Sequence, residues 1–352
     1  MTVAHHGHPR PTPSTPYGGP KDRAPAPRPG QWSRPPRPYE ERPMAQQPQR
    51  QPQRQPQPQP NPHLPDRVAA VYGEQDLSTV PAFAGGFINF GYWARLPDLA
   101  DGPLSEADRI RSEQDLYRLV LDTFGRTRGR SALEVGCGRG LGCALALREY
   151  GLAPVTGLDI HPDQIARARA THAELLAGPS TDGPADAPAP LAFVEGAAQR
   201  IPLPDASVEC LYSVEAAQHF RDLPGFAREA ARVLRPDGRL ALTTFFARAH
   251  EAARALPGLL PPYADGLDVP HVIDDVAAAL AAAGLRDIRV RAIGEAVWEP
   301  YDRYMAQRRE LRDKWPRRYL TAYRTGLLDY YLVTAAAPAP VSAPGGSAST
   351  GP

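Results

Sequence analysis

The most constraining feature of the sequence is a glycine-rich turn between an apolar segment and a helix. Residues 133–142 read LEVGCGRGLG, with glycines at every second position from Gly136. Glycine permits tight turns, and its missing side chain lets backbone approach a ligand closely. A second apolar segment (VTGLD) ends in Asp159, 19 residues after Gly140. A carboxylate at that place can accept the hydroxyl groups of a ribose. Together these features predict a site for a nucleoside-containing cofactor.

Strand-like and helix-like segments alternate around this turn. Helices of about 10–15 residues between strands indicate a parallel, doubly wound α/β sheet. In such a sheet the ligand binds at the carboxyl ends of the strands, where the strand order reverses. Expected strands cover residues 132–135, 155–160, 191–195, 208–213, 239–245, 287–293 and 327–334.

Proline is concentrated at the beginning of the chain. Of the 42 prolines, 19 fall in residues 1–65, where residues 47–60 alternate glutamine, proline and arginine. Proline removes hydrogen-bond donors, and this stretch offers too little apolar surface to offset the entropy of ordering. We therefore expect a disordered Pro-rich arm over residues 1–65, a folded domain over 66–334 and a disordered tail over 335–352.

Charge and cysteine content narrow the function. Residues 1–65 hold 9 basic and 3 acidic side chains, which leaves 31 basic and 36 acidic ones for the rest. A mildly acidic domain argues against nucleic-acid binding. The 3 cysteines form no C-x-x-C pair, so we expect no disulfide framework and no metal site. Because no apolar run reaches about 18 residues and no secretory signal is evident, we expect a cytoplasmic protein without a membrane span.

The spacing of the glycines discriminates between cofactors. A dinucleotide site requires G-x-G-x-x-G, but the third position is Leu141 or Cys143, depending on the starting glycine. The pattern present is E-x-G-x-G-x-G, which begins at Glu134. A carboxylate there is poorly placed beside a pyrophosphate and suits a ligand with positive charge. An NAD-dependent oxidoreductase is therefore the less favoured interpretation.

With these motifs, residues 70–334 resemble the class I S-adenosylmethionine-dependent methyltransferases, in particular those acting on natural products and quinones. The resemblance rests on the glycine loop, on Asp159, on residues 196–205 (GAAQRIPLPD) and on residues 231–240 (ARVLRPDGRL). It implies a Rossmann-like, seven-stranded sheet with an antiparallel last strand, and S-adenosyl-L-methionine as cofactor. The cofactor-binding residues that it implies are Glu134, Gly136, Gly138, Gly140, Asp159, Ile160, Ala197, Ala198, Tyr92 and Trp93. Ala197 departs from the family, which usually has an aspartate there.

Two further segments carry candidate functions by the same resemblance. Residues 213–220 (SVEAAQHF) resemble a segment whose histidine is proposed as a general base, so His219 and Glu215 are the expected catalytic residues. If the segment is helical, Glu215 and His219 lie on one side, and Glu215 could orient the histidine or bind an acceptor amine. Residues 85–93 (GGFINFGYW) resemble an N-terminal lid over the cofactor, and a capping pattern at residues 105–108 predicts a following helix to about residue 124.

The sequence thus predicts an enzyme that methylates a small-molecule acceptor. We expect a secondary metabolite and favour O-methylation because His219 offers a base. N- or C-methylation on the same fold remains open, as does a non-catalytic scaffold that recruits partners through the Pro-rich arm. The sequence does not determine the acceptor or the oligomeric state.

Overall fold

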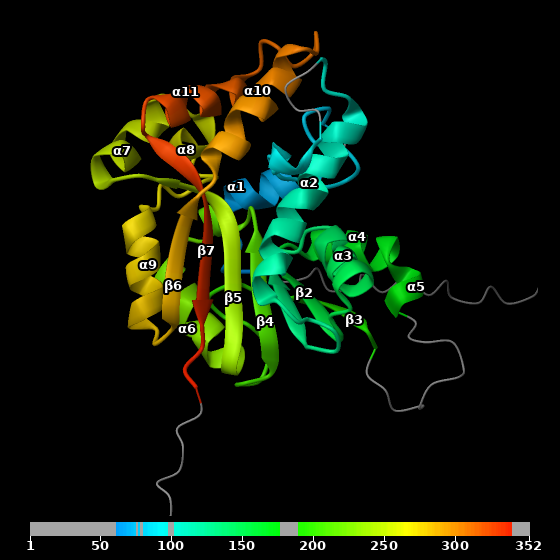
Figure 1. The fold of residues 1–352 in the computed structure, drawn as a ribbon. Helices are drawn as coiled ribbons and strands as arrows, with labels where there is room; N and C mark the ends of the chain where they lie inside the picture. Colours follow the sequence, from blue (N-terminus) through cyan, green and yellow to red (C-terminus); the bar gives the residue numbers. More distant parts are fainter. Residues whose placement is uncertain (1–60, 75–76, 78–79, 98–101, 177–188, 340–352) are drawn as a thin grey trace, which may run out of the picture. The chain divides into compact units, whose positions relative to one another are not determined.

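The apolar segments form strands of a single sheet (Figure 1). The structure is a computed structural model that describes residues 61–74, 77, 80–97, 102–176 and 189–339, all within one compact unit, Pro58–Pro352. The expected arm up to residue 60 and the end of the expected tail lie outside these residues. In the described part the strands are β1 (Ala132–Val135), β2 (Val155–Asp159), β3 (Leu191–Glu195), β4 (Val208–Val214), β5 (Leu234–Ala247), β6 (Arg286–Ala292) and β7 (Leu328–Ala336).

The glycine turn follows β1, at the point between β1 and β4 where the strand order reverses. The order is β3-β2-β1-β4-β5-β7-β6, in one seven-stranded sheet of the described chain. Neighbours from β3 to β5 pair in parallel, and β7 is antiparallel to both β5 and β6. The chain leaves β1 towards β2 on one side, while β4 lies on the other side. This arrangement confirms the predicted doubly wound α/β fold with an antiparallel last strand.

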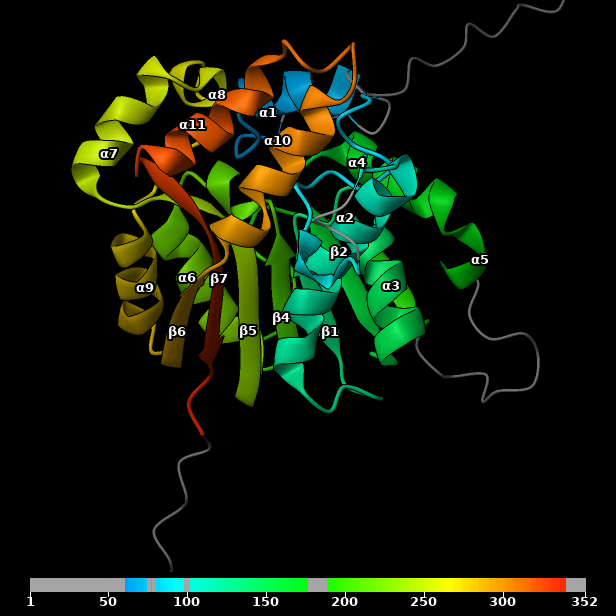
Figure 2. The same cartoon turned by 45° about the horizontal axis from the view of Figure 1, so that its top comes forward.

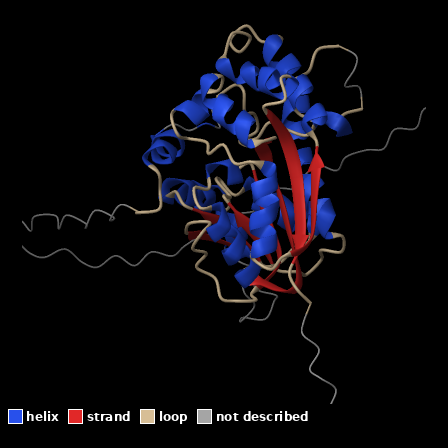
Figure 3. Ribbon diagram, turned by 90° about the vertical axis from the view of Figure 1, so that its left-hand side faces the viewer, coloured by secondary structure: helices blue, strands red, loops and turns tan. Residues whose placement is uncertain are grey.

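Helices cover both faces of the sheet (Figure 3). Leu133 and Val135 of β1 pack in a core with α6 and α9, whereas Ala132 packs in the other core with α2, α3 and α4. The period of two along the strand therefore separates two apolar layers. Helices of the described residues are α1 (Asp66–Ala69), α2 (Glu106–Leu121), α3 (Leu141–Tyr150), α4 (Pro162–Thr171), α5 (Ala173–Leu176), α6 (Leu223–Val233), α7 (His250–Ala255), α8 (Pro261–Ala264), α9 (Ile273–Ala282), α10 (Trp298–Ala306) and α11 (Arg318–Arg324).

A group of short helices lies at one end of the sheet. In Figures 1 and 2, α7, α8, α10 and α11 gather there together with α1. This is the end where the parallel strands finish, because the glycine turn follows β1 and the segment 215–220 follows β4. The insert after β5, which supplies α7 and α8, and the segment before β7, which supplies α10 and α11, therefore cover the end of the sheet where a ligand is expected.

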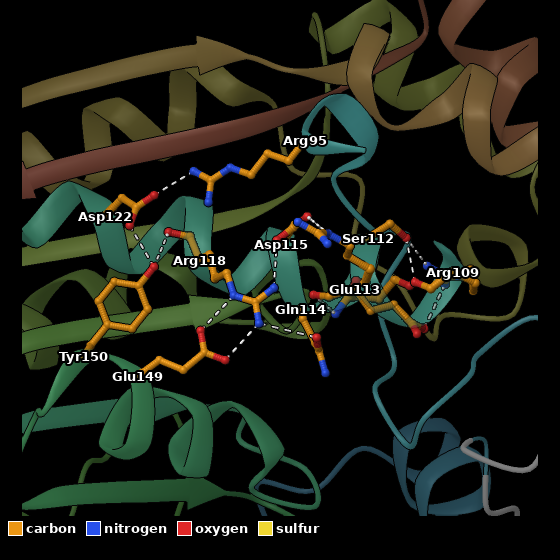
Figure 4. Close-up of polar contacts among 12 residues, drawn as sticks. Arg95, Arg109, Ser112, Glu113, Gln114, Asp115, Arg118, Asp122, Glu149 and Tyr150 are labelled. Atoms are coloured by element: carbon orange, nitrogen blue, oxygen red, sulfur yellow. Dashed lines mark hydrogen bonds and ion pairs between the residues drawn. The ribbon is translucent and has the colours of Figure 1, made fainter. Parts of the chain in front are cut away.

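Polar contacts along α2 fix this helix to its neighbours (Figure 4). Ser105 caps the helix by accepting from the backbone N–H of Asp108, as the capping pattern predicts. Arg118 donates to both carboxylate oxygens of Glu149 on α3, at 2.7 and 2.8 Å. The Tyr150 hydroxyl donates to Asp122 at 2.7 Å. These contacts fix α2 against α3, so the loop that precedes α2 ends at a fixed position.

A buried arginine anchors that loop. The Arg109 side chain is 0% exposed and forms an ion pair of 3.0 Å with Glu113. Its guanidinium also donates to the backbone oxygens of Ala82 and Asn89. Burial raises the pKa of Glu113 to about 8 against the opposing charge of Arg109. The arginine thus satisfies backbone groups of a loop that has no strand partners.

The structure adds detail at the edges of the predicted domain. Pro62, His63 and Pro65, which fall within the expected arm, line a cavity that the glycine turn also borders. Strand β7 extends to Ala336, two residues beyond the predicted end of the domain. No described helix is both long and apolar enough to cross a membrane.

Candidate functional site

The glycine turn after β1 is held against β2. The backbone N–H groups of Gly136 and Cys137 both donate to the Leu158 carbonyl oxygen, at 2.8 and 2.9 Å. Gly136 has a φ of +78°, and a Cβ there would lie 2.2 Å from the Ala216 Cβ. Gly138 has a φ of +51°, yet a Cβ there would meet nothing within 4 Å. The turn is therefore packed against protein at its first glycine and open at its second.

Asp159 closes the turn from the neighbouring strand. Its carboxylate accepts from the backbone N–H of Gly138 at 2.8 Å and from that of His161 at 2.9 Å. Burial raises the pKa of Asp159, while the two backbone donors oppose this shift. Each oxygen retains a further lone pair, so the carboxylate can still accept hydroxyl groups.

The turn and Asp159 border a cavity of about 330 Å³. This volume lies in the range of small-molecule sites. Five predicted cofactor-binding or catalytic residues of the turn and of the ends of β2 and β4 contribute to its wall: Gly136, Gly138, Asp159, Ile160 and Glu215. Ala198, Gln199 and His219 complete it on the side of β3 and β4, and Val68 and Tyr72 close it from the N-terminal segment.

Several of the other predicted cofactor-binding residues lie next to the cavity but not in its wall. Gly140 is the N-cap of α3 with a φ of +74°, and a Cβ there would lie 2.4 Å from the Phe193 ring. Glu134 is fully buried and accepts from the Cys143 thiol at 2.9 Å and the Tyr212 hydroxyl at 3.2 Å. Burial raises the pKa of Glu134 to about 7. Ala197 is 3% exposed and forms a bridge with Arg200.

The aromatic segment 85–93 contributes different residues from those predicted. Tyr92 and Trp93 do not line the cavity, whereas Gly86, Phe87 and Ile88 do. The Trp93 ring is fully buried beside Arg109, and its N–H donates to the Phe90 carbonyl oxygen at 3.0 Å. The segment therefore covers the cavity through its first half and is anchored in the core through its second half.

His219 lies in a chain of hydrogen bonds that determines its tautomer. The Thr244 hydroxyl donates to the amide oxygen of Gln218, so the amide nitrogen faces the imidazole Nε2 at 3.2 Å. The Tyr72 hydroxyl lies 2.9 Å from the same Nε2. At the other nitrogen, the Leu267 carbonyl oxygen at 3.1 Å and the Asp268 carboxylate can only accept, so Nε2 is the acceptor and the proton resides on Nδ1. There Asp268 accepts it at 3.0 Å.

The surroundings of His219 favour its charged form. Burial alone would lower the pKa of the imidazole, but the hydrogen bond and the charge of Asp268 raise it above the usual 6.5. The Asp268 side chain is 3% exposed and also accepts from the Tyr319 hydroxyl at 3.3 Å. The result is a histidine at the cavity wall that is oriented by a buried carboxylate.

Glu215 does not orient His219, because the segment between them is not an α-helix. Glu215 has a φ of +47°, and only a short 3-10 turn follows, over Ala217–His219. Its carboxyl group instead accepts from the Phe90 backbone N–H and the Tyr330 hydroxyl, both at 2.5 Å. Burial raises the pKa of Glu215 to about 8. The carboxyl group therefore links the lid segment, the last strand and the cavity.

Sequence reasoning missed Asp268 and Tyr330. Asp268 lies in the insert after β5, where a single aspartate carries no recognisable pattern. Tyr330 lies in an apolar strand and looks like an ordinary core residue. Only the fold brings either residue to the segment 215–219. Among the residues that the structure describes, no three His, Cys, Asp or Glu side chains are grouped so as to hold a metal ion.

Replacing Glu215 by glutamine should make stability less dependent on pH. A carboxyl group whose pKa rises from 4.5 to about 8 on folding keeps its proton in the native state. Its stabilising contribution is complete below pH 4.5 and is lost as the pH rises through 8. Glu215 thus contributes a fall in unfolding free energy of at most about 1.4 kcal/mol per pH unit in that window. Denaturant unfolding at pH 5–8 should show a shallower fall for Glu215→Gln.

The matched control is Glu149→Gln. The hydrogen bond to Arg118 lowers the pKa of Glu149, so this group is charged in both states above pH 5. Its replacement should shift stability without changing the slope above pH 5. Parallel curves for Glu215→Gln and the wild type would show that Glu215 is ionised in the folded protein.

Comparisons with known proteins agree with this geometry. Residues 133–242 match the family described as "Methyltransferase domain". The fatty-acid O-methyltransferase of Mycolicibacterium smegmatis is 35% identical over 153 residues, which cover 43% of this chain and 50% of that enzyme. The chain thus aligns with only half of that relative's length. The probable phthiotriol/phenolphthiotriol dimycocerosates methyltransferase 2 of Mycobacterium ulcerans is 32% identical over 217 residues, which cover 61% of this chain and 69% of that protein.

A solved structure shares the fold. The geranyl diphosphate C-methyltransferase from Streptomyces coelicolor A3(2) superposes with a TM-score of 0.61 at 18% identity, covering 78% of this chain and 98% of that one. The family match spans the glycine turn, Asp159 and the segment that carries His219. With the strand order and the cavity at the end of β1 and β4, the chain belongs to the class I S-adenosylmethionine-dependent methyltransferases.

Proposed function

We propose that this methyltransferase transfers a methyl group to a hydroxyl group of its acceptor, with His219 as the general base. The observation that carries the proposal is the chain Tyr72–His219–Asp268 at the wall of the cavity. An acceptor hydroxyl must lose its proton during transfer, and a base within hydrogen-bond distance can take it. This hydrogen-bonded chain of side chains favours O-methylation over C-methylation. We propose a secondary metabolite as the acceptor.

The residues in the cavity wall fit the cofactor. S-Adenosylmethionine, when bound, supplies an electrophilic methyl group on a sulfonium centre. Asp159 would hold its ribose, because this carboxylate lines the cavity with acceptor capacity left. Gly138 would lie against it, because this glycine faces open space. Ala198 and Gln199 would border its base. The backbone of the turn is already fixed, so little ordering is required on binding.

His219 is arranged to accept a proton at Nε2. Its Nδ1–H is directed to Asp268, so the lone pair lies on Nε2, beside the Tyr72 hydroxyl. The negative charge of Asp268 stabilises the imidazolium that forms. The Tyr72 hydroxyl lies 2.9 Å from Nε2, and the acceptor hydroxyl would take its place there. The remaining requirement is alignment of the acceptor, which can supply about 7–11 kcal/mol.

Replacing Asp159 by alanine should weaken S-adenosylmethionine binding by about 1–3 kcal/mol, because ribose hydroxyls and the Gly138 N–H lose their acceptor. Isothermal titration calorimetry measures this difference directly. Asp163→Ala is the control, since Asp163 is an exposed carboxylate in the first turn of α4. Equal affinity in Asp159→Ala and the wild type would remove Asp159 from the cofactor site.

The reaction itself can be tested without knowing the acceptor. The protein is incubated with cofactor that carries a radiolabelled methyl group and with an extract of its source, and the labelled product is identified. A methyl ether supports the proposal, whereas a methyl ester would indicate a carboxylate acceptor that needs no base. A new carbon–carbon or carbon–nitrogen bond would assign the enzyme to C- or N-methylation. If no label is transferred although the cofactor binds, a non-catalytic role is favoured.

A further inference from the structure

The loop between α10 and α11 concentrates positive charge. Residues 308–318 (RRELRDKWPRR) hold six basic and two acidic side chains, a net charge of +4. The remainder of residues 66–352 holds 25 basic and 34 acidic side chains. In Figures 1 and 2 this loop lies at the top of the molecule, at the same end of the sheet as α7 and α8. We call residues 308–318 the basic loop.

Part of the basic loop is anchored to the domain. The Leu311 side chain is only 4% exposed. Arg317 donates to both carboxylate oxygens of Asp302 on α10, at 2.8 and 2.9 Å. The Arg308 guanidinium lies over the Tyr304 ring, 3.6 Å from its centroid. These contacts order the backbone of the loop, which in turn positions its other side chains.

The other basic side chains of the loop face solvent without a counter-charge. Arg309, Arg312 and Lys314 are exposed, and none of them forms an ion pair with another residue that the structure describes. Arg318 is also exposed, and its guanidinium reaches the Leu259 carbonyl oxygen only at 3.5 Å. Exposed cations of this kind add little to the stability of a fold. Their concentration on an otherwise acidic domain indicates a surface for an anionic partner.

The same loop exposes a tryptophan. Three large apolar side chains are exposed in the described part of the chain, and Trp315, at 39%, is the only aromatic one among them. Its ring packs partly on Tyr319, with the two centroids 6.0 Å apart. The boundary between lipid headgroups and acyl chains accommodates both the ring and the N–H of an indole. The anionic partner is therefore expected to offer an apolar layer beside its charges.

A lipid bilayer fits this combination better than another polyanion does. Clustered lysines and arginines attract anionic headgroups, and stable peripheral binding usually requires an apolar anchor as well. A nucleic acid that extended past the basic loop would meet the acidic remainder of the domain. A flat membrane surface contacts only one end of the molecule, and charges more than about 8 Å away are screened at physiological salt.

We propose that the basic loop docks the protein on an anionic phospholipid bilayer, with the Trp315 ring among the headgroups and Arg309, Arg312 and Lys314 against the lipid phosphates. The contact is peripheral and requires no spanning helix. It does not depend on methyl transfer. It would bring the end of the sheet that carries the cavity close to the bilayer.

Binding of the full-length protein to vesicles tests the proposal. The vesicles consist of phosphatidylcholine with about one third phosphatidylserine, and bound protein is measured by sedimentation. Replacing Arg312 and Lys314 together by glutamine should raise the Kd by about 10- to 30-fold, since each basic residue contributes about fivefold. The control replaces Arg126 and Arg128 by glutamine. These exposed residues precede β1, at the opposite end of the sheet, so the Kd should change by less than about twofold.

Both double variants keep the Pro-rich arm and its charge, so the arm cannot account for a difference between them. Both should also keep the Tm of the wild type, because the replaced side chains are exposed.

Fluorescence quenching distinguishes a bilayer from other anionic partners. Phosphatidylserine vesicles with brominated acyl chains should quench part of the wild-type tryptophan emission. Trp315→Phe should lose this quenching, since Trp93 and Trp298 are 0% exposed. The proposal is overturned by equal Kd values for the two double variants, by no binding to anionic vesicles, or by quenching that persists in Trp315→Phe. Binding of a single-stranded oligonucleotide or of polyglutamate as tight, per negative charge, as that of the vesicles would also overturn it.

Discussion

Replacing His219 by alanine is expected to lower turnover by about 10²–10⁴-fold, the usual contribution of a general base. The imidazole Nε2 lies at the cavity wall, and alanine leaves no group there that can accept the acceptor's proton. The affinity for S-adenosylmethionine should stay within about twofold, because the turn and Asp159 do not depend on this side chain. Single-turnover methylation of the acceptor and calorimetric titration of the cofactor measure the two quantities separately.

Asp268→Asn separates positioning from proton transfer. The amide oxygen of the new asparagine can still accept from Nδ1–H, but the negative charge that raises the pKa of His219 is lost. A base must be unprotonated, so the wild-type rate should rise with pH through a value above 6.5. In Asp268→Asn this limb should move to lower pH. A His219→Ala enzyme with near-normal turnover and an unchanged pH profile would reduce His219 to part of the cavity wall.

His219 could be predicted from the sequence, but its partner could not. The histidine lies within a short, contiguous segment, SVEAAQHF, so the pattern that points to it can be recognised from neighbouring residues alone. Asp268 follows 49 residues later, on the loop between α8 and α9. The predicted orienting group, Glu215, required a helix that its positive φ excludes. Local spacing determines which residue types lie near a strand end, whereas pairing between distant segments depends on how the insert packs.

The fold was predictable for a related physical reason. Apolar strands, helices between them and a glycine turn are local properties, and they indicate a doubly wound sheet wherever they alternate. Their boundaries agree within a few residues for most elements; β5 begins at Leu234, five residues earlier than expected, because the turn after α6 continues the pairing with β4. The antiparallel direction of the last strand came from family resemblance alone, since spacing does not specify how a last strand pairs.

The aromatic segment shows the limit of composition as a guide. Four aromatic residues among three glycines at positions 85–93 predict burial against the domain, and all four rings are buried or partly buried. Composition does not determine which rings face the cavity. Arg109 decides this, because its contacts with the Asn89 carbonyl oxygen and the Trp93 ring draw the second half of the segment into the core. A buried arginine on a helix gave no sign of that role in the sequence.

Gly136→Ala is expected to destabilise the protein by about 2–5 kcal/mol, the combined cost of a left-handed backbone with a side chain and of overpacking. The added Cβ would lie 2.2 Å from the Ala216 Cβ, in the segment that leads to His219. Either the glycine turn or that segment must shift, so both cofactor binding and turnover should fall. Guanidinium unfolding monitored by circular dichroism measures the stability loss.

Gly138→Ala provides the control, since Gly138 also has a positive φ but an added Cβ there would not collide with another residue. A Cβ at Gly138 meets no protein atom within 4 Å, so only the left-handed conformation should cost stability, about 1–2 kcal/mol. Because the residue lines the cavity, the same methyl group should weaken S-adenosylmethionine binding by about 10- to 100-fold. Gly136→Ala should then mainly lower the unfolding free energy, whereas Gly138→Ala should mainly lower the affinity for S-adenosylmethionine. Unchanged affinity in Gly138→Ala would mean that the cofactor does not lie against the open side of the turn.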